Sequence, residues 1–387
     1  MNRPDQLDVW ILAGQSNMEG AGELSESLSP SSTVWNFSSA GVWEIAKDPL
    51  HRLWESSSAI HRELLRGWLP EDRQGLSDQE LGIEQAQTRT IGAGLGIAFG
   101  QTMVQAGGLP IGLVPCAHGG TSLGQWSPRL KSKGSSLYGS MIDRALAAGG
   151  NLKGVLWYQG EADGWSLDDS NTYADRLKEF IFALRADLNQ PTLPFLSVQI
   201  GKTTLDSPNS VAWEKVRHAI GHIPLNVPNT AVTTAIDLAL NDCIHLNTHA
   251  LHRLGRRLAR LATELQQCSG TAPSIGRRAG PRVVGVERIT VDHERTMIRL
   301  RCEGVSGGWQ PSDNMLGFDY LGVDGNPHPI KHVYNAARNS VEPSTIDVHL
   351  NLRPDSGESV VYGYGLRPSC NVVDAADMAL CGMRIFL

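Results

Sequence analysis

The chain has 387 residues and a net charge of −6; 41% of its residues are hydrophobic and 19% are charged. The length corresponds to roughly two to three domains, and the composition is typical of a globular protein. The lack of a basic excess argues against nucleic acid or an anionic membrane as a partner. No apolar run approaches the roughly 18–20 residues that cross a bilayer. The first residues do not resemble a signal peptide, which predicts a cytoplasmic protein, or a secreted or periplasmic one if a leader has been trimmed.

The first 270 residues alternate between apolar runs and amphipathic stretches. The apolar runs predict strands at residues 7–14, 109–117, 152–160, 193–201 and 230–238. The amphipathic stretches predict helices at residues 93–107, 136–150, 169–189 and 248–267. Nearly continuous apolar strands between such helices indicate a parallel sheet covered on both faces. We therefore expect an α/β domain of three α/β/α layers with five parallel strands, over residues 1–272.

Two segments depart from this alternation. Residues 21–90 are polar and irregular, include four tryptophans, and follow the first strand directly. We expect this insertion to overhang the carboxyl edge of the sheet, where lids and substrate loops lie. Residues 269–281 are rich in Gly, Ser, Pro and Arg and predict a linker. Short β-like runs follow, which predict a small β-rich C-terminal domain over residues 281–387.

The six cysteines are spread singly, and no Cys or His pair has the spacing of a zinc site. We expect most of them to be buried reduced thiols. The sequence predicts neither a metal nor a cofactor.

Ser16 follows the first strand in the stretch "GQSN", at the carboxyl edge where sites form in such sheets. A serine hydroxyl reacts only when a base takes its proton. His245, after the fifth strand, is the candidate base, and Asp242 stands three residues before it, close enough to hold the imidazole. The alternatives are that Ser16 caps a helix, and that Asp242 is a turn residue while a backbone carbonyl orients His245.

A serine hydrolase also needs hydrogen-bond donors for a tetrahedral oxyanion. The backbone N–H of Ser16 is one candidate. "HGGTS" at 118–122, after the second strand, offers glycine N–H groups that can approach closely. "YQGEAD" at 158–163, after the third strand, offers the side-chain amide of Gln159, although Gln159 is alternatively a residue that caps the next loop.

Together, four blocks resemble those of the SGNH-type carbohydrate acetylesterases, in particular the sialate O-acetylesterase and acetylxylan esterase group, carbohydrate esterase family six. The blocks, in chain order, are "GQSNM", "GLVPCAHGGTS", "LWYQGEAD" and "DCIHL". The resemblance covers roughly residues 8–265 and implies the flavodoxin-like SGNH-hydrolase fold. It also implies that Ser16 is the nucleophile, His245 the base and Asp242 its orienting acid. Gly120 and Gln159 would then be the oxyanion donors beside the Ser16 amide.

Other residues are assigned around this site. Gly119 is an alternative to Gly120 as a donor, and the resemblance implies that Glu161 positions the loop. Asn17 is a further candidate beside the nucleophile. Trp126 and Trp165 follow the second and third strands, which predicts that they line the substrate site. The four tryptophans of the insertion are either packing residues or a stacking wall for sugar rings.

Two departures from the family pattern bear on the substrate. Position 118 is His where relatives often carry an apolar or aromatic residue, and "LNTHALH" follows His245 in place of a Pro-containing turn. The sequence predicts an esterase that removes acetyl groups from a sugar, of the sialate 9-O-acetyl or acetylated-xylan type, through an acetyl-enzyme. The alternatives are a general short-chain esterase or thioesterase, and a catalytically silent glycan-binding protein. The expected partner is the acetylated carbohydrate; the oligomeric state is not predicted.

Overall fold

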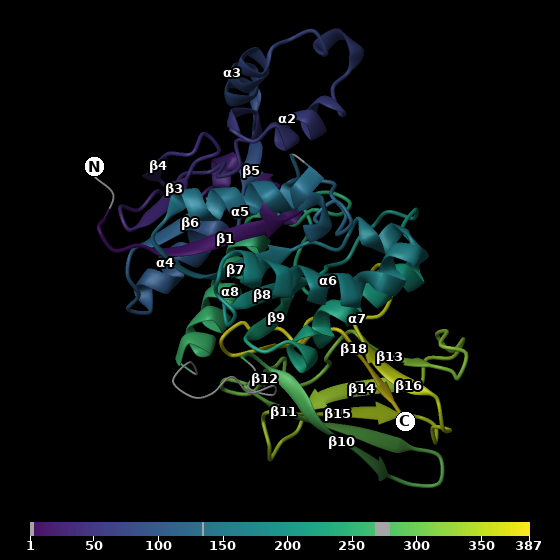
Figure 1. The fold of residues 1–387 in the computed structure, drawn as a ribbon. Coiled ribbons are helices and arrows are strands. Elements are labelled where there is room, and N and C mark those ends of the chain that lie inside the picture. Colours follow the sequence, from purple (N-terminus) through teal and green to yellow (C-terminus); the bar gives the residue numbers. More distant parts are fainter. Residues whose placement is uncertain (1–3, 134, 268–278) are drawn as a thin grey trace.

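The computed structural model describes residues 4–133, 135–267 and 279–387, and its centre is a seven-stranded sheet (Figure 1). The strand order is β4-β3-β6-β1-β7-β8-β9. The five expected strands are β1 (Asp8–Gly14), β6 (Ile111–Pro115), β7 (Asn151–Tyr158), β8 (Phe195–Gln199) and β9 (Thr230–Thr234). All five pair in parallel. The predicted α/β fold class is therefore confirmed.

Two further strands come from the segment that was expected to be an irregular insertion. β3 (Val34–Phe37) pairs in parallel with β6, and β4 (Trp43–Ile45) closes the edge as an antiparallel strand. Both runs are short, so their apolar residues do not stand out from the polar sequence around them. The two strands are held by contacts with residues distant in sequence: a methyl group on Gly112 of β6 would lie 2.6 Å from the Trp43 ring. Part of residues 21–90 thus extends the sheet.

The rest of that segment forms an arm that projects from the molecule (Figure 1). It contains α2 (Ala59–Arg66) and α3 (Asp78–Thr88). Around its base lie the short helix α1 (Ser16–Glu19) and the small pair of β2 (Gly22–Glu23) with β5 (Ile91–Ala93). Arg66 of α2 bonds Asp78 of α3 with an Nη2–Oδ1 distance of 2.6 Å, so the two helices of the arm are tied together.

Helices cover both faces of the sheet. They are α4 (Gly96–Gln105), α5 (Leu137–Ala148), α6 (Leu167–Asp187), α7 (Ser210–Asn226) and α8 (Thr248–Gln267). α4 packs against α8, where Gly255 allows a close approach: a Cβ there would lie 2.3 Å from the Leu95 carbonyl oxygen. α6 packs against α7, and right-handed crossovers place this pair on the opposite face. α7 was not predicted; Trp213, Val216 and Ile220 recur at helical spacing, but Pro224 lies inside its last turn.

The C-terminal part is built from antiparallel strands with a core of their own. A four-stranded sheet contains β10 (Arg282–Thr290), β11 (Thr296–Glu303), β15 (Thr345–Leu350) and β14 (Val333–Arg338). A three-stranded sheet contains β13 (Phe318–Leu321), β16 (Ser359–Tyr362) and β18 (Met383–Phe386), and β12 (Trp309–Gln310) pairs with β17 (Val373–Asp374). The expected β-rich character agrees with this. Residues 269–278 of the predicted linker lie outside the described residues, and the domain boundaries stay a prediction.

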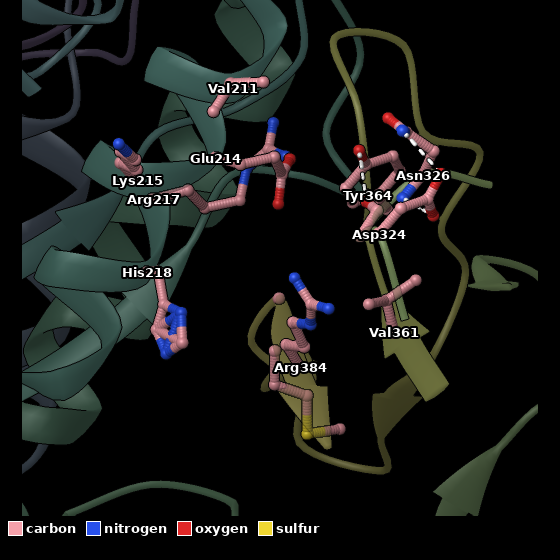
Figure 2. A pocket seen from close by; sticks show the side chains of 13 residues that line it. Val211, Glu214, Lys215, Arg217, His218, Asp324, Asn326, Val361, Tyr364 and Arg384 are labelled. Carbon is pink, nitrogen blue, oxygen red and sulfur yellow. Dashed lines mark hydrogen bonds and ion pairs between the residues drawn. The ribbon is translucent and has the colours of Figure 1, made fainter. Parts of the chain in front are cut away.

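The C-terminal sheets dock beside α7 and β9 through buried polar groups. The Arg217 guanidinium of α7 donates to the carbonyl oxygens of Gly363 and Gly365, at 2.7 and 3.0 Å. A cavity of about 280 Å³ lies at this seam. Figure 2 shows it between side chains of α7, such as Glu214, and Arg384 of β18. None of the helices among the described residues is both long enough and apolar enough to span a bilayer.

Candidate active site

The turn after β1 brings Ser16 to the carboxyl edge of the sheet. Gly14 ends β1 with a φ of +135°, and a Cβ on it would lie 2.0 Å from the carbonyl oxygen of Tyr158, so only glycine fits. The next residue, Gln15, donates its N–H to that same oxygen at 2.9 Å. Ser16 then opens α1, and its backbone N–H has no hydrogen-bond partner among the described residues.

His245 and Asp242 lie where the sequence predicted them, beside Ser16. His245 Nε2 is 2.9 Å from Ser16 Oγ, and His245 Nδ1 is 2.7 Å from Asp242 Oδ2. A carboxylate only accepts hydrogen bonds, so Nδ1 carries the hydrogen and the Nε2 lone pair faces the serine hydroxyl. The three side chains therefore form one continuous chain of hydrogen bonds.

Asp242 also forms the turn that the alternative interpretation proposed. Its Oδ1 accepts the backbone N–H groups of Ile244 and His245, at 2.8 and 2.7 Å, while Oδ2 holds the imidazole. Burial alone would raise the pKa of Asp242. The hydrogen bonds from His245 and Ile244 outweigh it and hold this pKa below its ordinary value. One carboxylate thus shapes the loop and orients the imidazole.

Asn17 links the nucleophile turn to two other loops. Its Oδ1 accepts the N–H of Leu246 at 2.9 Å, and its Nδ2 donates to Glu161 Oε1 at 2.9 Å. Glu161 is buried, and burial raises the pKa of its carboxyl, whereas the hydrogen bond from Asn17 acts in the opposite direction. Asn17 and Glu161 are therefore placed to hold the loops around Ser16.

The two glycines of "HGG" differ in what their N–H groups do. The Gly119 N–H donates to Glu19 Oε2 at 2.8 Å, and a Cβ on Gly119 would lie 3.6 Å from Ser16 Cβ. The Gly120 N–H has no hydrogen-bond partner among the described residues, and Gly120 has a φ of +67°, which favours glycine. Gly120 is therefore the member of the pair whose N–H is available to a ligand.

Gln159 requires a correction. Its side chain is fully buried, and Nε2 donates to the Thr121 carbonyl oxygen at 3.0 Å and to Asp163 Oδ2 at 2.7 Å. Its Oε1 accepts the hydroxyl of Tyr173 at 3.0 Å. Both amide hydrogens are thus used inside the protein, which leaves none for an oxyanion. This geometry corresponds to the alternative, in which Gln159 braces the loops after β6 and β7.

The side chain that sequence reasoning missed is Gln15. Its Oε1 accepts the backbone N–H groups of Gly160 and Ala162, at 3.3 and 3.2 Å, so it ties the loop after β7 to the nucleophile turn. Its place directly before Ser16 in the "GQSN" block was the signal for it.

Of the two tryptophans expected to line the substrate site, Trp126 differs from the expectation. Trp126 is fully buried; its Nε1 donates to Thr121 Oγ1 at 3.0 Å, and it packs edge-on against Trp157. Trp126 therefore does not line a substrate site, because its ring packs in the core although it follows β6. Trp165 is 46% exposed, and Trp68, in the arm, is 76% exposed and lies against Gly120.

The comparisons with known proteins identify the family of the chain. Residues 6–264 match the family described as carbohydrate esterase, sialic acid-specific acetylesterase. The chain belongs to this family. The prediction of an esterase is therefore confirmed, and a carbohydrate ester is the class of substrate that the family implies.

Two relatives extend this result. The probable carbohydrate esterase At4g34215 of Arabidopsis thaliana is 31% identical over 273 residues, which cover 65% of this chain and 88% of the relative. The crystal structure of the At4g34215 protein matches with a TM-score of 0.51 over 67% of this chain and 98% of that chain, at 30% identity. XAC1771, a carbohydrate acetylesterase from Xanthomonas citri, matches with a TM-score of 0.66 at 20% identity. It covers 98% of this chain and 80% of its own, so the fold similarity includes the C-terminal part.

Proposed function

We propose that this protein removes O-acetyl groups from a carbohydrate, with Ser16 as nucleophile, His245 as general base and Asp242 as the group that orients it. The observation that carries the proposal is the hydrogen-bond chain from Asp242 Oδ2 through His245 to Ser16 Oγ. An isolated serine at a helix start would not need a buttressed imidazole aimed at its hydroxyl.

In the first half of the proposed reaction, Ser16 Oγ attacks the acetyl carbonyl carbon while its proton passes to His245 Nε2. The carbonyl electron pair moves onto oxygen, where the N–H groups of Ser16 and Gly120 stabilise the negative charge. When this intermediate collapses, the bond from the acetyl carbon to the sugar oxygen breaks. The proton on Nε2 goes to that oxygen, and the sugar departs with a free hydroxyl group. The acetyl group stays bound to Ser16 Oγ.

In the second half, water attacks the acetyl group on Ser16 and gives its proton to His245 Nε2. The second tetrahedral intermediate uses the same two N–H groups. Its collapse breaks the bond to Ser16 Oγ, which regains the proton from Nε2, and acetate leaves. Asp242 stays ionised throughout and stabilises the imidazolium that forms in each half.

A fluorophosphonate probe and a turnover assay together test this proposal. Wild-type protein should be labelled on Ser16 and should hydrolyse 4-nitrophenyl acetate, and Ser16→Ala should lose both. Labelling without any acetyl release would favour another acyl group as substrate; a comparison of acetyl and butyryl esters would identify a general short-chain esterase. A wild-type protein that resists the probe and binds sugars without turnover would be a glycan-binding protein, which contradicts the proposal.

The first candidate substrate is a sialic acid that carries a 9-O-acetyl group, because the family description names sialic acid. Acetylated xylan is the second candidate. Acetate release from the two substrates, measured side by side at equal ester concentration, distinguishes them. A higher kcat/KM for acetylated xylan would overturn the sialate assignment and leave the esterase mechanism intact.

A further inference from the structure

An exposed indole lies beside the free N–H of the candidate oxyanion site. A Cβ on Gly120 would lie 3.4 Å from Trp68 Cζ2, and a Cβ on the preceding Gly119 would lie 3.6 Å from Ser16 Cβ. Consecutive Cα atoms are about 3.8 Å apart, so the edge of the indole lies no farther than roughly 14 Å from Ser16. An acetyl group followed by one sugar ring fits within that limit.

Trp68 differs from the other tryptophans of its segment. Trp35 and Trp54 are buried, whereas the Trp68 side chain is 76% exposed, although tryptophan has a large and mostly apolar side chain. An indole left in water at the mouth of a site gains free energy when a ligand covers it. Its flat face suits the apolar C–H face of a pyranose ring, while the hydroxyl groups of the sugar stay in water.

Contacts of α2 hold the arm against the loop that contains Gly120. His61 of α2 stacks on His118, with the two Nδ1 atoms 3.0 Å apart, and His118 directly precedes Gly119. Ser135 Oγ accepts the N–H of Ile60 at 2.8 Å. The arm is therefore anchored through His61 to the loop that contains Gly120.

We propose that Trp68 and Gly120 form a sugar subsite, in which a pyranose ring stacks on the indole while its acetyl group reaches Ser16. This inference rests on the proposed function for its chemistry, and it assigns to the arm the recognition of the carbohydrate. The ligand class is a pyranoside with an exposed C–H face, whether a sialic acid or a xylose unit carries the ester.

The kinetic test compares esters with and without a ring. Trp68→Ala should raise KM about tenfold or more for acetylated xylotriose or for 9-O-acetyl sialic acid, whichever the wild type prefers, with kcat changed less than about twofold. Hydrolysis of methyl acetate, which has no ring to stack, should keep its wild-type kcat/KM. Trp68→Phe retains a flat face and should recover most of the affinity. Ile83→Ala removes an exposed apolar side chain from α3 of the same arm and should leave both substrates unaffected.

A binding test separates the subsite from the chemistry. In the Ser16→Ala background, calorimetry with the same acetylated sugar should show a dissociation constant about tenfold weaker when Trp68→Ala is added. Unchanged affinity, or a parallel loss of methyl acetate hydrolysis, would overturn the subsite. Trp68-dependent binding by a wild-type protein that turns over neither ester would support the subsite and overturn only the hydrolytic function.

Discussion

The hydroxyl of Thr203 donates a hydrogen bond of 2.9 Å to the main-chain carbonyl oxygen of Cys243, the residue between Asp242 and His245. The backbone N–H of Thr203 donates in turn to the carbonyl oxygen of Leu366, at 2.8 Å. Leu366 belongs to the C-terminal part, so this part supports the loop that contains the candidate base. The fully buried Thr203 therefore links them, next to the N–H of Thr204, which donates to the same Cys243 oxygen at 2.8 Å.

Thr203→Val should therefore lower kcat for acetyl esters about fivefold, because the loss of one neutral hydrogen bond is worth about 1 kcal/mol and here loosens the His245 loop. The N–H of Leu205 also loses its acceptor, which Thr203 Oγ1 provides at 3.1 Å. The matched control is Thr233→Val in β9, since Thr233 Oγ1 is buried with no hydrogen-bond partner among the described residues. Steady-state kinetics of both variants measure this effect. If Thr203→Val and Thr233→Val have equal kcat values, Thr203 does not support the His245 loop.

The approximate location of the candidate site could be predicted because parallel strands of one sheet all end at the same edge. The carboxyl ends of β1, β6, β7 and the segment after β9 meet at one edge, so Ser16 and His245 come together although 229 positions separate them. The distance from Asp242 to His245 is short in sequence, and a tight turn brings their side chains together. These relationships depend on strand order more than on individual packing.

The direction of single side chains could not be predicted in the same way. Gln159 and Trp126 follow the expected strands, yet both turn inward, because Thr121 offers them a carbonyl oxygen and a hydroxyl in the interior. β3 and β4 were missed because four- and three-residue strands are defined by their partners and not by a periodic pattern. The contact between Trp68 and Gly120 joins two loops whose approach no local sequence pattern encodes.

Asp242→Asn should lower kcat by about 10³–10⁴-fold, because a neutral amide no longer stabilises the imidazolium and no longer selects the Nδ1–H tautomer. The KM for small acetyl esters should change little, since Asp242 is not expected to touch them. Single-turnover kinetics with 4-nitrophenyl acetate measure the acylation step directly. A loss of only about tenfold would indicate that Ser16 and His245 act as a dyad.

The same variant tests the pH dependence of stability. Burial raises and hydrogen bonds lower the pKa of Asp242, and its pKa in the folded protein lies below the ordinary value. The folded state thus favours the carboxylate, and its contribution is complete above the unfolded pKa of about 3.9 and is lost as pH falls through the folded value. The difference in Tm between wild type and Asp242→Asn should be constant above about pH 5 and shrink toward pH 3. A difference that grows on acidification would contradict this assignment.

Asn17 and Glu161 can be tested as a pair. Asn17→Asp keeps an acceptor for the Leu246 N–H but places a second carboxylate against Glu161 Oε1, so both kcat and Tm should fall. Glu161→Gln should restore them in the double variant, because its amide can donate to the carboxylate introduced at position 17, while Glu161→Gln alone should have a small effect. A double-mutant cycle should give a coupling of about 1–3 kcal/mol. Additive losses would mean that the two side chains act independently.

Gln159 separates a bracing role from an oxyanion role. Gln159→Leu has a similar volume but removes the side-chain hydrogen bonds to Asp163 Oδ2, the Thr121 carbonyl and the Tyr173 hydroxyl. Asp163 Oδ2 keeps the N–H of Leu123, and the Tyr173 hydroxyl keeps the main-chain carbonyl oxygen of position 159, so of these three groups the Thr121 carbonyl alone loses its partner. Unfolding free energy should fall by about 1–3 kcal/mol, which is the cost of one unsatisfied buried group. The kcat of the folded fraction should stay within about tenfold of wild type, since removal of a true oxyanion donor costs about 10²–10³-fold. Chemical denaturation and active-site titration with a fluorophosphonate measure the two quantities on one sample. A loss of kcat by that larger factor at unchanged stability would show that Gln159 turns toward the substrate during the reaction, against the arrangement in which its amide is fully bonded.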